Sequence, residues 1–149
     1  MWVTMDGLDK RGRLGRIDTD PMQKRSRSKE QLDFEIVFYE RLLAETPGFI
    51  DAMRALGEAY SRRGWYEKGL RMDEQLTRLR MEDPVVWYNL ACSYSLLNRP
   101  DEAIDALRKA IGLGYDDFAY LLKDPDLSTA HRSPKLRQLL AERLAHKPS

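Results

Sequence analysis

The chain repeats itself at a spacing of 34 residues, and this repeat constrains its fold more than any other feature. The stretch that begins at Met53 aligns with the stretch that begins at Trp87. The aligned pairs are Met53 and Trp87, Leu56 and Leu90, Gly57 and Ala91, and Tyr60 and Tyr94. Repeats of this length are typical of small helical units that stack on one another, because each unit buries its apolar face only against its neighbours.

Turn signals stand at matching places between the paired stretches. They are Arg63-Gly64-Trp65 in the first copy and Asn98-Arg99-Pro100 in the second. Each signal therefore separates two helices. Pro100 suits the first turn of a helix, where its missing N–H would have no intrahelical acceptor. Gly112 and Gly114 are predicted to end the helix that Pro100 begins.

A further helix is predicted ahead of the repeats, from Lys29 to a point before Pro47. Its apolar residues recur at spacings of three and four, which places them on one stripe. They are Leu32, Ile36, Tyr39, Leu42 and Leu43. Residues 1–28 show neither helical nor strand periodicity, and we interpret them as a mostly disordered tail.

The composition indicates a folded protein with one core rather than a disordered, disulfide-rich or membrane-spanning chain. With 42% hydrophobic and 33% charged residues, the chain has enough apolar material for one core and the charge expected of exposed amphipathic helices. Cys92 is the only cysteine, which excludes an internal disulfide and agrees with a reducing compartment. No apolar run is long enough to span a membrane, and no secretory signal stands at the amino end. Cytoplasm is the expected compartment.

The amino-terminal tail carries the positive charge of the chain. Residues 1–29 hold eight Lys or Arg against four Asp, so the rest of the chain is slightly acidic. We interpret the run from Lys24 to Lys29 as a solvated tail. The alternative is that it contacts phosphates, which would make the chain a nucleic-acid-associated protein. No aromatic residues interleave with these charges to stack on bases.

The pattern Trp87-x-x-Leu90-Ala91-x-x-Tyr94, followed by Ala103, resembles the tetratricopeptide repeat. The resemblance implies an all-α fold in which antiparallel helix pairs form a short right-handed superhelix. Gly57 or Ala91 would then let the second helix of a unit approach closely. Asp73 stands where the family prefers Phe, and Met53 replaces the usual Trp.

The resemblance implies one helical domain over residues 29–149, made of four parts. Its expected parts are a capping helix at 29–46, repeat one at 48–82, repeat two at 84–114 and closing helices at 115–146. The string that contains Asp124-Pro125-Asp126-Leu127 is similar to a segment often found after bacterial tetratricopeptide arrays. The final helix should cover the end of the stack with Leu136, Leu139, Leu140 and Leu144. If either cap fails, a dimer would take its place.

No constellation for catalysis, metal or cofactor binding is visible. His131, in a predicted loop, and His146 are interpreted as ordinary surface histidines. Asp124, Asp126 and Ser128 match the start of a calcium loop, but Thr129 and Lys135 break the pattern. We therefore expect these acids to cap a turn, and we expect no catalytic or metal site and no cofactor.

The resemblance implies that the concave side, formed by the first helices of the units, binds an extended or helical peptide. Cys92 could face this groove or pack as a small hydrophobe. A ligand of mixed or basic charge would suit Asp51 and Glu58. We expect a non-catalytic module with a protein or peptide partner, as a monomer or homodimer and away from membranes. The predicted partner-binding residues are Asp51, Arg54, Glu58, Arg62, Val85, Tyr88, Asn89, Cys92 and Ser95.

Overall fold

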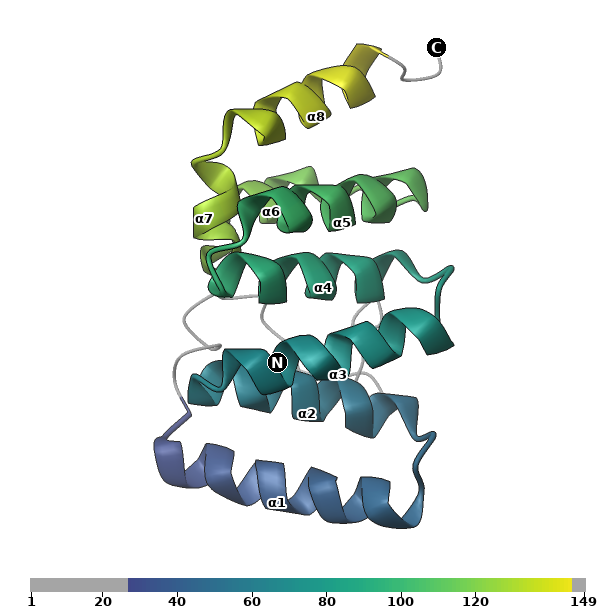
Figure 1. Cartoon of the computed structure of the whole chain (residues 1–149), viewed down its shortest axis with the longest axis vertical. Helices are drawn as coiled ribbons and strands as arrows, with labels where there is room; N and C mark the ends of the chain where they lie inside the picture. Colours follow the sequence, from purple (N-terminus) through teal and green to yellow (C-terminus); the bar gives the residue numbers. More distant parts are fainter. Residues whose placement is uncertain (1–26, 146–149) are drawn as a thin grey trace, which may run out of the picture. The chain divides into compact units, whose positions relative to one another are not determined.

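The computed structural model describes residues 27–145, and over this range every regular element is helical (Figure 1). The helices are α1 (Lys29–Glu45), α2 (Ile50–Arg63), α3 (Tyr66–Leu79), α4 (Pro84–Leu96), α5 (Pro100–Gly112), α6 (Phe118–Lys123), the 3-10 turn η2 (Pro125–Leu127), α7 (Ser128–His131) and α8 (Pro134–Ala145). The predicted all-α class is confirmed. None of these helices is long and apolar enough to cross a membrane. The basic tail falls almost entirely outside the described residues.

The helices fall into two compact units, although the sequence suggested a single helical domain. The first unit ends at Arg80 and the second begins at Met81. In the first unit, α1 packs on α2 and α2 on α3. In the second, α4 packs on α5, and the closing elements η2 and α7 pack on α4. Each unit therefore has its own core.

Local sequence explains where the helices begin and end. Ser28 and Gln31 form a reciprocal cap at the start of α1, in which each side chain accepts a hydrogen bond from the backbone N–H of the other. Pro100 occupies the first turn of α5, as predicted. Gly64 after α2 and Gly114 after α5 adopt the left-handed conformation, with φ of 90° and 109°. Glycine is favoured there because it carries no Cβ.

The first unit is built around the stripe predicted for α1. Leu32 and Ile36 are buried in one cluster with Leu56 and Tyr60 of α2. Where α2 meets α3, a Cβ on Gly57 would lie 3.3 Å from Asp73 Oδ1. The small residue thus permits the close approach expected from the repeat.

In the second unit, α8 covers α5 only in part. Leu136 and Leu139 are buried, but Leu144 is 72% exposed, so the expectation that it helps to cover the end of the stack is wrong. Figure 1 shows α8 rising away from α5 towards its carboxyl end. The last turn of α8 therefore has no surface to pack on, although its sequence continues the apolar spacing.

Candidate functional site

The predicted binding face of α4 is largely buried. Val85, Tyr88, Cys92 and Ser95 are each at most 8% exposed. Asn89, on the same helix, is half-buried. The elements that pack on this helix include η2 and α7 of the closing segment, residues 115–131. Much of the surface that the sequence offered to a partner is thus occupied by the chain itself.

Tyr88 is the centre of this arrangement. Its ring stacks on Tyr115 with centroids 4.5 Å apart and planes 13° apart. Its hydroxyl donates a hydrogen bond of 2.7 Å to Oδ2 of Asp124. Ring stacking and a buried hydrogen bond therefore both tie α4 to the closing segment.

Asp124 is fully buried, and its carboxylate contacts Cys92 and the backbone of Asp126 as well as Tyr88. Cys92 Sγ lies 3.8 Å from its Oδ2, and the backbone N–H of Asp126 donates to its Oδ1 at 3.0 Å. The second contact starts η2, so the turn-capping role predicted for Asp124 is confirmed. Within residues 27–145, no group of three or more potential metal ligands comes together.

Two further contacts hold α7 in place. Ser95 Oγ accepts a hydrogen bond from the backbone N–H of Ala130 at 3.4 Å. His131 Nε2 lies 2.8 Å from the carbonyl oxygen of Leu121. His131 ends α7, so the loop predicted there is wrong, because a helix of four residues is too short to show periodicity. His146 lies outside the described residues.

The predicted residues of the first unit form a charged stripe on α2. Asp51 and Glu58 are exposed, and Arg54 and Arg62 are half-buried. The guanidinium of Arg27 lies between two carboxylates, with Nη1 2.5 Å from Glu35 Oε1 and Nη2 2.6 Å from Glu58 Oε1. A basic side chain of the chain itself therefore occupies the acidic part of this stripe.

Two phenols beside the stripe resist ionisation. Burial raises the pKa of Tyr60, and so does the hydrogen bond of 2.6 Å that its hydroxyl donates to Glu40. Burial, followed by the charge of Glu35, also raises the pKa of Tyr39. Both phenols are neutral at physiological pH and can donate hydrogen bonds. The stripe itself therefore presents carboxylates and guanidinium groups, while the side chain of Tyr60 is buried in the core of the unit.

Comparison with known proteins bears on the second unit. The family profile described as the tetratricopeptide repeat matches residues 84–113, which form the packed helix pair α4 and α5. This match and the packed helix pairs of the structure fit a tetratricopeptide repeat protein. Tetratricopeptide repeats indicate a protein–protein interaction module, and the family is generally non-catalytic.

One curated relative is a protein of Arabidopsis thaliana whose name describes it as chloroplastic. It is 36% identical over 89 residues, which cover 58% of this chain and 27% of the relative. The chain thus spans about a quarter of the length of the curated relative that it matches. No solved structure matches the chain.

Sequence reasoning missed two residues that bear on the repeat faces. Asp124 was assigned only to a turn, although it also contacts Tyr88 and Cys92. Arg27 was assigned to the tail, although it pairs with Glu58 on α2. The position of Arg27 within a basic run, ahead of a stripe with acidic residues, was the one available signal. No sequence signal paired Asp124 with Tyr88.

Proposed function

We propose that the chain binds a basic segment of a partner protein on the α2 stripe, without catalysis. Asp51 and Glu58 are exposed there and attract Lys or Arg side chains. The comparable face of α4 is less available, because Tyr88 and Ser95 are buried in contacts with the closing segment. Of the predicted α4 residues, Asn89 keeps the most exposure, and its amide can hold a peptide backbone.

The observation that carries the proposal is the position of Arg27. Two carboxylates, one from α1 and one from α2, hold its guanidinium at 2.5 and 2.6 Å. An Arg or Lys of a partner has the same chemistry and can replace Arg27 at these carboxylates. Exposed ion pairs each contribute only about 0–1 kcal/mol, so the partner needs several such contacts, and salt should weaken its binding.

Affinity capture with the full chain tests this proposal. Immobilised wild type is compared with Glu58→Lys and Asp51→Lys, which reverse charge on the stripe. Glu67→Lys on α3 and Asp105→Lys on α5 are matched controls, because both acids are exposed and lie off the stripe. We expect partners, identified by mass spectrometry, to be lost with the stripe variants and retained with the controls. The same partner set from all five proteins would overturn the proposal.

A nucleic-acid role through the basic tail remains a prediction from the sequence. The tail lies almost entirely outside residues 27–145. Within that range, the side chain of Arg27 forms its ion pairs with the carboxylates of Glu35 and Glu58.

A further inference from the structure

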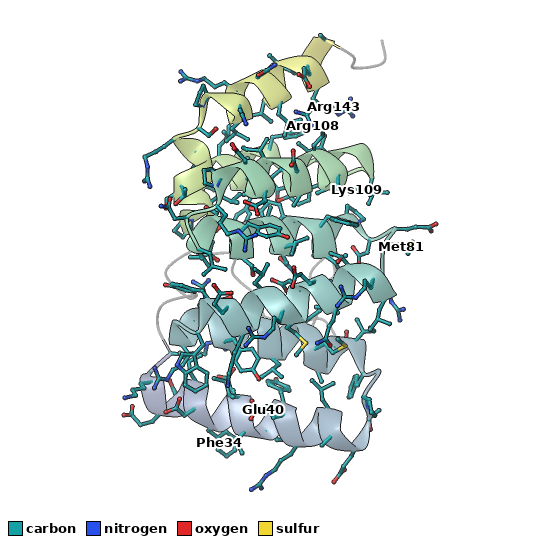
Figure 2. The ribbon with its side chains drawn as sticks, in the orientation of Figure 1. Phe34, Glu40, Met81, Arg108, Lys109 and Arg143 are labelled. Carbon is teal, nitrogen blue, oxygen red and sulfur yellow. The ribbon has the colours of Figure 1, made fainter. Side chains whose placement is uncertain are left out.

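The outer face of α1 is apolar where the end of a helical repeat array is normally polar. Phe34 is 73% exposed, Phe38 51% and Val37 46%. Figure 2 shows Phe34 on the side of α1 that faces away from α2, with Glu40 on the side that faces it. Exposed apolar residues are ordinary when scattered, but three on one stripe mark a contact surface. Terminal repeats need a polar outer face for solubility, so this helix does not act as a finished cap.

Charged residues flank this apolar patch on the same stripe. Glu30 lies four residues before Phe34, and Arg41 lies three residues after Phe38, which keeps all four on one side of the helix. Both charged side chains are exposed, and neither forms an ion pair within residues 27–145. The stripe therefore has Glu30 before its apolar centre and Arg41 after it, with the exposed Glu45 one turn beyond Arg41 at the end of the helix.

We propose that this face binds the same face of a second copy, with the two α1 helices antiparallel. A two-fold axis between Phe34 and Phe38 sets Phe34 of one copy opposite Phe38 of the other. The same axis sets Arg41 of each copy opposite the turn that holds Glu30 of the other. Because the axis repeats every contact, two such ion pairs flank the apolar centre. A parallel arrangement would instead oppose like charges.

The size of the patch sets the strength of this dimer. Three apolar side chains on one helix offer less than the roughly 1,200 Å² buried by the smaller stable interfaces. The dimer should therefore dissociate readily, and its population should depend on protein concentration.

Exchanging the charges of Glu30 and Arg41 in the full chain tests the antiparallel pairing of the two α1 helices. Sedimentation velocity over a wide concentration range should give a reversible monomer–dimer equilibrium for the wild type. Arg41→Glu alone, or Glu30→Arg alone, sets like charges opposite one another. Because symmetry removes both ion pairs at once, either change should raise the dissociation constant about tenfold. The double variant Glu30→Arg/Arg41→Glu recreates both ion pairs with their signs exchanged, and it should recover the affinity of the wild type.

Controls separate pairing from folding. Phe34→Ala should weaken the dimer, whereas Leu144→Ala on α8, where the side chain is 72% exposed, should leave it unchanged. Thermal melts followed by circular dichroism confirm that each variant is folded. A double variant that dimerises no better than either single one would overturn the proposal. A wild type that stays monomeric at every concentration would also overturn the proposal. The face would then be covered by something other than a second copy, such as another protein.

Discussion

At the scale of single residues, the hydrogen bond between Tyr88 and Asp124 joins α4 to the closing segment of the second unit. Sequence reasoning placed Tyr88 on the correct helix and stripe but expected it to face a partner. Its hydroxyl instead reaches a residue 36 positions later in the chain. Helical periodicity shows which side chains share a face, but it does not show which distant segment covers that face. Local spacing alone therefore could not identify this contact.

Tyr88→Phe should destabilise the second unit. The substitution keeps the stacking on Tyr115 but removes one hydrogen bond to the buried carboxyl group of Asp124, and the loss of a buried hydrogen bond of this kind costs about 1–3 kcal/mol. Urea denaturation measures the loss. Tyr66→Phe is the control, because Tyr66 is 36% exposed and lies on α3 of the other unit. Equal losses from the two substitutions would contradict the structural role of this hydrogen bond.

At the scale of helices, the repeat predicted much of the fold. The observed bounds of α2 through α5 fall within the two predicted units, and the turns come at Gly64 and Pro100 as expected. The match succeeds because the small, large and aromatic positions recur at a fixed spacing. It fails for the closing elements, since η2 and α7 are only three and four residues long. Elements of that length are held by tertiary contacts, which a periodic pattern does not record.

Ala91→Leu tests the close approach of α4 to α5. Ala91 is completely buried, so a larger side chain must push the helices apart, and overpacking of this kind typically costs about 1–3 kcal/mol. The free energy of unfolding should fall by that amount in guanidinium denaturation. Ala141→Leu, at an exposed position of α8, should change it little. If Ala91→Leu were as stable as the wild type, the small residue at this repeat position would have no packing role.

At the scale of the whole molecule, the chain covers part of its own predicted binding surface in each unit. Arg27 pairs with Glu58 in the first unit, and Asp124 contacts Tyr88 in the second. These pairings leave the α2 stripe as the more open of the two predicted faces. A partner is therefore expected to compete with one arginine on α2, whereas on α4 it would have to displace packed aromatic contacts.

Hydrogen–deuterium exchange of the full chain, alone and with its captured partner, shows which helix the partner covers. A partner bound on the α2 stripe should slow exchange of α2 amides around Glu58, while exchange of α4 and of residues 115–131 is unchanged. Faster exchange over residues 115–131, together with new protection of α4, would mean that the partner displaces the closing segment. That result would contradict the assignment of the binding surface to α2.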